Sequence, residues 1–366
     1  MPEFKHPDLF GRLAAEQKST VPRAVLLYGM GNGADKILAE LSAKSIPVAG
    51  FFASDGFVRG QFFHGQRVLS FSEVRERYAP EDCVILLAFG SARPEVLETV
   101  QRVAAEYEVL VPDMPVCGGP LFDAAFYDIH RDEIAAARAL FADEASKELF
   151  DKIIAFRLTG DFRTLMDAVS ERSAWDILKE SRITVRKIAD FGAYTGDSAR
   201  AAMALFPINL ILAAEPDRRN FRKLSDWSGT VTDCTVECHR VAVCDTMGEA
   251  LFDDSGNRNA GLCTGKSHVT VCTDTPDGLL AGRAVDYIKY DIEGAEASAL
   301  NGSVKTIRTF TPALRIALYH RSADLFQIPL QLSEISNRYR LYLTRERSFP
   351  AWDIDLVAIP IERHTS

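Results

Sequence analysis

The sequence predicts an α/β protein with two parallel sheets, a small N-terminal one and a larger C-terminal one that ends in an antiparallel hairpin, joined by a helical connector. Short apolar runs alternate twice with amphipathic segments, which is typical of parallel strands linked by crossover helices. Between the two series, residues 130 to 180 repeat apolar residues at spacings of three and four, as helices do. The last two strand-like segments have no helix pattern between them, which indicates an antiparallel pair.

The first series predicts strands at 24–29, 47–53, 83–89 and 108–113, separated by amphipathic segments such as "GADKILAELSAKS". The periodicity breaks at "MPVCGGP" near residue 114, where a domain boundary is expected. We predict a Rossmann-like domain of the nucleotide-binding type at 1–120, the helical connector at 121–180 and the second α/β domain at 181–366.

The second series begins at "RKIADF" and predicts strands at 209–216, 235–243, 284–291 and 313–320. The strand-like segments "YRLYLTRER" and "DIDLVAIP" form the expected terminal hairpin. Residues 250–275 are polar and rich in Gly and Asn, and we predict a mobile loop there.

Composition narrows the classes of partner. The chain has 366 residues, 47% hydrophobic and 25% charged, with a net charge of -9. Without a broad basic surface, nucleic acid and anionic membranes are unlikely partners, and a small-molecule or glycan acceptor is the expectation. No apolar run approaches the roughly 18 residues of a membrane helix, and no signal peptide is evident, so a cytoplasmic protein is expected. The seven cysteines, an odd number, predict reduced thiols. The sequence leaves a homo-oligomer open.

Open α/β sheets bind ligands at the carboxyl ends of their strands, and three strand ends of the second series carry unusual residues. The first is the glycine turn "DFGAYTGDS", and the second is the end of the strand 209–216, at Glu215 and Pro216. Val241 and Ala242 offer an apolar wall for a purine ring. The candidate cofactor-binding residues of the turn are Asp190, Gly192, Ala193, Tyr194, Thr195, Gly196, Asp197 and Ser198.

Each signal alone also has a structural explanation, because a glycine turn is often only a turn and Glu215 could be a solvated acid. Their order and intervals predict a pocket for S-adenosylmethionine. Carboxylates suit a cationic amino-acid ligand, and an acid at the position of Glu215 can accept hydrogen bonds from the two hydroxyls of a ribose.

Together with "VDYIKYDIEGAEASALNG" and "ALYHRSADLFQIPL", these segments resemble the FkbM-type methyltransferases over residues 185 to 335. The element K-x-D-x-E-G-x-E is the most specific part. The resemblance implies a class I methyltransferase sheet and an S-adenosylmethionine-dependent O-methyltransferase that acts on a hydroxyl of a sugar, polysaccharide or natural product. Tyr194 stands where the family commonly has Asn.

Three residues are candidates for catalysis. Asp291 ends the fourth strand and is expected to face the sulfonium of the donor. His320 ends the fifth strand, and the ordinary pKa of a histidine suits a general base near neutrality, although it could equally hold loop backbone. Glu293 is the alternative base. Glu296 is expected only to complement the dipole of the following helix. Asp291 and Glu293 could bind Mg²⁺, but we predict no metal.

A second glycine turn, "YGMGNGADKIL", follows the first strand. Gly29, Gly31, Asn32 and Gly33 are a candidate N-terminal ligand site. The turn only partly matches the dinucleotide fingerprint, because Ala53 stands where the ribose-binding acid is expected. Two alternative functions follow from it: a nicotinamide-dependent oxidoreductase, and a non-catalytic protein that senses sugar nucleotides or acts as a scaffold.

Overall fold

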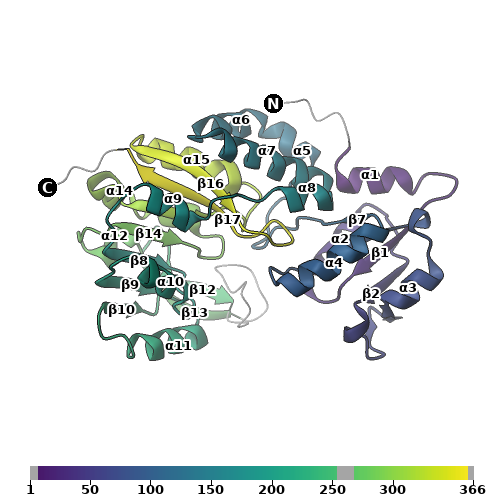
Figure 1. Ribbon diagram of the computed structural model, residues 1–366, viewed down its shortest axis with the longest axis horizontal. Helices are drawn as coiled ribbons and strands as arrows, with labels where there is room; N and C mark the ends of the chain where they lie inside the picture. Colours follow the sequence, from purple (N-terminus) through teal and green to yellow (C-terminus); the bar gives the residue numbers. More distant parts are fainter. Residues whose placement is uncertain (1–6, 254–267, 362–366) are drawn as a thin grey trace.

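The structure is a computed structural model that describes residues 7–253 and 268–361, and its two main sheets lie side by side (Figure 1). The first sheet has the strand order β5-β2-β1-β6-β7, and all its neighbours are parallel. Its strands are β1 Ala24–Tyr28, β2 Gly50–Ala53, β5 Leu69–Ser70, β6 Cys83–Leu87 and β7 Val109–Leu110. This confirms the predicted small parallel sheet, although β2 starts three residues later than predicted.

Helices cover both faces of the first sheet, so neighbouring residues of one strand are buried on opposite faces of it. Leu26 packs into one apolar core, and Leu27 into another. The elements around this sheet are α1 Leu9–Glu16, α2 Asn32–Ala43, η1 Asp55–Phe57, β3 Phe62–Phe63, β4 Gln66–Arg67, α3 Phe71–Arg77, η2 Pro80–Asp82 and α4 Pro94–Glu106.

The second sheet has the order β10-β9-β8-β14-β15-β17-β16. Its first five strands are parallel, whereas β17 pairs antiparallel with both β15 and β16, which confirms the terminal hairpin. The strands are β8 Lys187–Phe191, β9 Leu210–Ala214, β10 Thr235–His239, β14 Tyr287–Tyr290, β15 Ala313–Ala317, β16 Tyr339–Arg345 and β17 Ile354–Pro360. Its helices are α10 Asp197–Leu205, α11 Arg218–Ser228, α12 Pro276–Leu280, α13 Glu296–Asn301, α14 Val304–Phe310 and α15 Asp324–Ile335.

The connector is helical as predicted, and its helices α5 to α8 lie along the top of the view in Figure 1, whereas α9 lies lower, beside the second sheet. They are α5 Ala124–Ile129, α6 Arg131–Leu140, α7 Glu144–Thr159, α8 Phe162–Asp167 and α9 Ala174–Glu180. Helix α6 packs on α15, and α7 packs on β16. The backbone N–H of Leu343 in β16 donates to the hydroxyl of Ser146 in α7 at 3.0 Å. The connector therefore shares its core with the second sheet.

Two parts of the second half differ from the prediction. The single strand expected at 235–243 is divided, and its last residues form β11, Ala242–Val243, in a separate sheet of order β11-β13-β12. The predicted loop at 250–275 is wrong at both flanks, where β12 Gly248–Asp253 and β13 His268–Asp274 pair antiparallel. Residues 254–267 of that prediction lie outside the described residues.

Backbone hydrogen bonds tie the first sheet to the second. The N–H of Ser91 donates to the carbonyl of Phe349 at 2.8 Å, and the N–H of Phe349 donates back at 3.0 Å. The N–H of Cys117 donates to the carbonyl of His320 at 3.0 Å. These bonds hold the β6–α4 loop and the segment before the connector against the C-terminal strand ends. Within 7–253 and 268–361, none of the helices has the length and apolar character needed to span a bilayer.

Candidate active site

A cavity of about 840 Å³ lies at the carboxyl ends of the central strands of the second sheet. Its walls come from both halves of the chain. Residues of the second half that line it are Gly192, Tyr194, Asp197, Ser198, Ala214, Glu215, Pro216, Asn220, Val241, Ala242, Val243, Phe252, Lys289, Asp291, Ile292, Glu293, Ala295, Tyr319, His320, Trp352 and Asp353. Residues of the first half are Gly90, Ser91, Ala92, Arg93, Pro94 and Val116.

The glycine turn after β8 is fixed by the neighbouring strand ends. Gly192 has φ +79°, and a Cβ there would lie 1.8 Å from the carbonyl oxygen of Asp291, so only glycine fits. Tyr194 has φ +49°, a left-handed conformation that Asn adopts more easily than Tyr. Gly196 is required by packing, because a Cβ would lie 2.4 Å from the ring of Trp227.

The side chain of Glu215 links the turn after β8 to the segment that follows β9. One carboxylate oxygen accepts the N–H of Tyr194 at 2.9 Å, and the other accepts the N–H of Asp217 at 2.9 Å. The residue is 6% exposed, and burial raises the pKa of its carboxyl to about 7, although these two hydrogen bonds oppose the rise. Each oxygen keeps a further lone pair for a ligand hydroxyl.

Lys289 provides the positive charge of the site. Its Nζ lies 3.4 Å from Asp190 and 3.4 Å from Asp291, and it donates to the carbonyl of Gly192 at 3.1 Å. Burial opposes the charge of Lys289, but the two carboxylates raise the pKa of its ammonium above its usual value. Burial raises the pKa of Asp190, against the effect of Lys289. Sequence reasoning included this lysine in the motif but assigned it no role.

Asp291 is half-buried and lies where several groups meet. The hydroxyl of Tyr319 donates to it at 3.1 Å, and Nε2 of His320 lies 3.6 Å from the same oxygen. Burial alone would raise the pKa of Asp291, but the charges of Lys289 and His320 lower it to about 2. Asp291 is therefore an anion at all working pH values.

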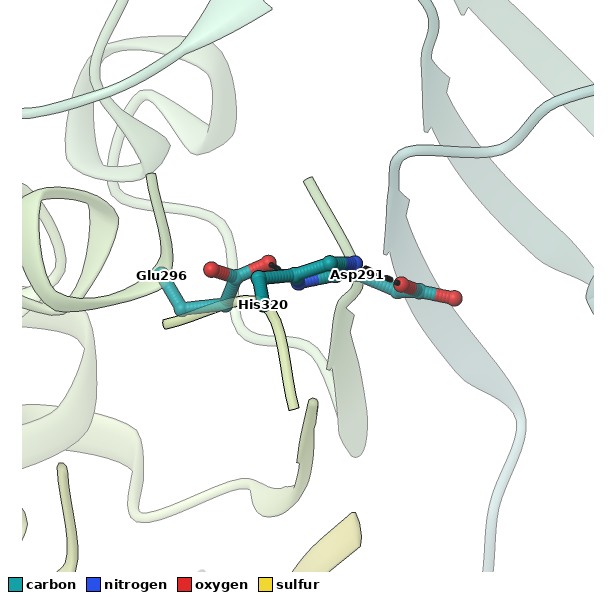
Figure 2. A group of neighbouring side chains, drawn as sticks. All are labelled: Asp291, Glu296 and His320. Atoms are coloured by element: carbon teal, nitrogen blue, oxygen red, sulfur yellow. Dashed lines mark hydrogen bonds and ion pairs between the residues drawn. The ribbon is translucent and has the colours of Figure 1, made fainter. Parts of the chain in front are cut away.

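His320 is fully buried between carboxylates, and Figure 2 shows its ring between Glu296 and Asp291. Its Nδ1 lies 2.9 Å from Oε1 of Glu296, and its Nε2 lies 3.4 Å from Oε2 of Glu293. Burial alone would lower the pKa of His320, but Glu296, Glu293 and Asp291 raise it to about 10. The expectation of an ordinary histidine pKa near neutrality is therefore wrong: without a ligand, the ring is an imidazolium at pH 7.

Glu296 does more than complement a helix dipole. It is 1% exposed, and its Oε1 accepts both the N–H of Ile292 at 2.8 Å and the Nδ1–H of His320. It thus joins the turn after β14 to the residue that follows β15. The sequence signal for this contact is the second glutamate of the E-G-x-E element, which lies one helical turn beyond Glu293.

Asp291, Glu296 and His320 could offer three metal-ligand atoms within 4.8 Å of one another. However, Oε1 of Glu296 already accepts two hydrogen bonds, one of them from Nδ1 of His320. The contact is explained as a charge-assisted hydrogen bond, and we assign no metal ligands. The absence of a metal stays a prediction.

The structure places most of the predicted site residues around one cavity. All three candidate catalytic residues line it, as do the predicted cofactor-binding residues Gly192, Tyr194, Asp197, Ser198, Glu215, Pro216, Val241, Ala242 and Asp291. Asp190, Ala193, Thr195 and Gly196 are not among the residues described as lining it. Asp190 instead lies behind Lys289, 2% exposed.

The first-domain glycine turn has a packing explanation. A Cβ at Gly33 would lie 2.5 Å from the carbonyl oxygen of Ala88, and one at Gly29 would lie 2.8 Å from the ring of Phe89. Gly31 has φ +113° and forms the N-cap of α2, which Asn32 begins. Asp55, the acid two residues beyond Ala53, accepts hydrogen bonds from the backbone N–H and the hydroxyl of Ser72, at the start of α3. The N-terminal ligand site stays a prediction.

Comparisons with known proteins match part of the chain to a protein family. Residues 190–348 match the family described as Methyltransferase FkbM domain. The crystal structure of the methyltransferase FkbM from Methylobacillus flagellatus KT is 18% identical, with a TM-score of 0.69 over 96% of this chain and 94% of that chain. It has the same fold along nearly the whole length. No curated protein matches the chain.

Two weaker similarities are to an rRNA methylase from Streptococcus thermophilus and to Aeropyrum pernix fibrillarin, whose structure contains natively bound S-adenosyl-L-methionine. The rRNA methylase is 8% identical, with a TM-score of 0.35 over 53% of this chain and 100% of that chain. Fibrillarin is 14% identical, with a TM-score of 0.31 over 51% of this chain and 73% of that chain. At these TM-scores, neither similarity is evidence for the function of this chain. Residues 190–348 are thus similar to the FkbM methyltransferase domains, and the protein is an S-adenosylmethionine-dependent methyltransferase.

Proposed function

We propose that the protein transfers a methyl group from S-adenosylmethionine to a hydroxyl oxygen of a sugar, polysaccharide or natural-product acceptor. The observation that carries this proposal is the shared cavity. Its walls include residues of the glycine turn and Glu215 together with His320, Glu293 and the loop 90–94 of the first domain. Its volume falls within the roughly 300–1,000 Å³ of small-molecule sites.

The residues fit the cofactor. Glu215 offers carboxylate oxygens to the ribose, Val241 and Ala242 offer an apolar surface to the purine, and Asp291 supplies a negative charge for a sulfonium. When bound, S-adenosylmethionine supplies an electrophilic methyl group. The protein's part is to align the acceptor oxygen in a site with little water and to take its proton.

His320 is the proposed proton acceptor, because it is one of the residues that line the cavity and an alcohol must lose its proton to become methylated. Its raised pKa has a consequence for pH dependence. The imidazolium must first lose a proton, so methyl transfer should increase with pH above neutrality. Glu293, 3.4 Å from the same nitrogen, is the alternative base.

The acceptor is proposed to rest against the first domain. There is no room for a Cβ at Gly90, because the ring of Trp352 lies 2.2 Å from that position. The backbone of Ser91 is hydrogen-bonded to that of Phe349. The loop is thus a fixed wall of the cavity. The proposed domains are residues 1–120, 121–180 and 181–366, and the first of them is proposed to recognise the acceptor.

The experiment has two arms. Calorimetry with S-adenosylmethionine, S-adenosylhomocysteine and NAD should give binding of both sulfur ligands, and binding of NAD alone would support an oxidoreductase instead. Methyl-labelled donor, incubated with a panel of glycans and polyhydroxylated natural products, should give a product whose label is an O-methyl group by mass spectrometry and NMR. A label attached to nitrogen or carbon would overturn the proposed acceptor chemistry.

A further inference from the structure

We infer that Glu296 is a positioning residue that holds His320 with its Nδ1 proton bound to the carboxylate and its Nε2 directed at the reacting oxygen. This inference rests on the proposed hydroxyl acceptor for its catalytic meaning, but its geometry stands without it. Glu296 itself lies behind the histidine, away from the cavity walls.

The first support is the geometry of the pair. Nδ1 of His320 and Oε1 of Glu296 are 2.9 Å apart, and both side chains are 1% exposed. The same Oε1 accepts the N–H of Ile292 at 2.8 Å, so the carboxylate cannot rotate without losing a backbone bond. A buried acceptor fixed in this way selects the imidazole nitrogen that stays protonated.

The second support is the other ring nitrogen. Nε2 is buried and makes no hydrogen bond within the described residues, although it belongs to a residue that lines the cavity. Its nearest charged neighbours are Glu293 at 3.4 Å and Asp291 at 3.6 Å. An acceptor oxygen that enters between these groups would meet Nε2, the nitrogen that Glu296 leaves unbound.

The arrangement has the logic of a base that is oriented by a third group. In the transfer, the bond from sulfur to the methyl carbon breaks and the bond from the acceptor oxygen to that carbon forms. The sulfur keeps the electron pair and becomes a neutral thioether. The proton of the hydroxyl passes to Nε2, while the Nδ1 proton stays on the bond to Glu296, whose carboxylate stabilises the imidazolium that results.

Other charged groups also face His320, and a pH experiment has to take them into account. From the elements packed around the ring, they are Asp291, Glu293, Tyr319, Arg321 and Asp324, with Lys289 behind Asp291. Of these, Asp324 titrates in the accessible range, because burial and the charge of Glu296 raise its pKa to about 7. Among residues 7–253 and 268–361, the hydrogen-bond partner of Nδ1 is Glu296.

The test compares Glu296→Gln with Glu334→Gln, which changes an exposed glutamate of α15. The pKa of His320 is followed by NMR of its ring nitrogens in the enzyme saturated with S-adenosylhomocysteine, with His320→Gln used for assignment. Glu296→Gln should lower this pKa by roughly 1 to 3 units, the usual effect of losing a close opposite charge. It should also shift the far-downfield, slowly exchanging Nδ1 proton. Glu334→Gln should change neither.

Activity provides a second readout. Glu296→Gln should move the ascending limb of the pH–rate profile to lower pH and reduce kcat with little change in KM. The loss should stay within the roughly 10²- to 10⁴-fold that removal of a general base costs. If kcat falls but the ascending limb of the pH–rate profile stays at the same pH, Glu296 has only a structural role. If the pKa of His320 is unchanged in Glu296→Gln, the inference is overturned.

If Glu296→Gln does not fold, proton exchange in the wild-type protein still tests the inference. A His320 Nδ1 proton that exchanges as fast as that of the partly exposed His239 would overturn the inference. The two proposals fail separately: a methyl group found on nitrogen contradicts the proposed acceptor, whereas the NMR titration tests Glu296 alone.

Discussion

Nζ of Lys289 lies 3.4 Å from Oδ1 of Asp190, and both side chains are buried. Lys289→Met would leave Asp190 without its counter-ion and would leave Asp291 with His320 alone of its two nearest positive groups. We expect it to lower the free energy of unfolding by about 3 to 5 kcal/mol, the usual cost of breaking a buried ion pair from one side. Urea unfolding of this variant and of the exposed control Lys179→Met measures the difference. Equal stability of the two variants would mean that the buried acids do not depend on Lys289.

Asp291→Asn tests the charge beside the sulfonium. The substitution keeps the shape of the side chain, so the affinity for neutral S-adenosylhomocysteine should change little. The affinity for cationic S-adenosylmethionine should fall by about 1 kcal/mol or more relative to it, the scale of a charge pair at about 4 Å. Calorimetry of both ligands gives the comparison, and an equal loss for both would move the sulfonium away from Asp291.

Glu215 predicts a pH dependence of cofactor binding. Because its pKa is raised to about 7, the carboxyl is protonated below that pH and becomes a better acceptor for ribose hydroxyls above it. The affinity for S-adenosylhomocysteine should therefore rise with pH through about 7. Glu215→Gln should weaken binding by roughly 1 to 3 kcal/mol and flatten this pH dependence. Glu98→Gln, an exposed change on α4, is the control, and a pH dependence that survives in Glu215→Gln would assign it to another group.

Arg93→Ala tests the first-domain wall. Arg93 precedes α4 and lines the cavity, whereas Arg102 lies on the exposed side of the same helix. With the acceptor found by methyl labelling, Arg93→Ala should raise the acceptor KM and leave the affinity for S-adenosylhomocysteine unchanged, because the cofactor contacts are on the other half of the chain. Arg102→Ala should change neither. An unaltered acceptor KM and kcat would remove Arg93 from acceptor recognition.

Gly33→Ala and Gly31→Ala separate packing from backbone conformation in the N-terminal turn. The new methyl at residue 33 would lie 2.5 Å from the carbonyl of Ala88, so a loss of about 1 to 3 kcal/mol in unfolding free energy is expected from overpacking. At residue 31 the added Cβ would have no heavy atom of the described residues within 4 Å apart from those of its chain neighbours, so only the strain of φ +113° remains, also about 1 to 3 kcal/mol. Proteolytic protection of the β6 strand end should fall in Gly33→Ala alone. Equal protection in both variants would contradict the packing role of Gly33.

The sequence by itself determined the two parallel sheets, the terminal hairpin and the glycine turn with Glu215 and Asp291. These features depend on local patterns: apolar runs form strands, and residues that end neighbouring parallel strands meet at one edge of the sheet. The boundaries were less exact. The run 235–243 alternates like one continuous strand, so nothing local showed that β11 would leave the main sheet to pair with β13.

The tertiary structure decided the electrostatics and the far wall of the cavity. His320 and Glu296 are 24 residues apart, and only the packing of α13 against the end of β15 brings the carboxylate to Nδ1 and raises the histidine pKa. The loop 90–94 enters the cavity because Ser91 pairs with Phe349, far away in the chain. A pKa is set by distances and burial, and an interdomain wall by long-range pairing, neither of which is encoded in the spacing of residues along one segment.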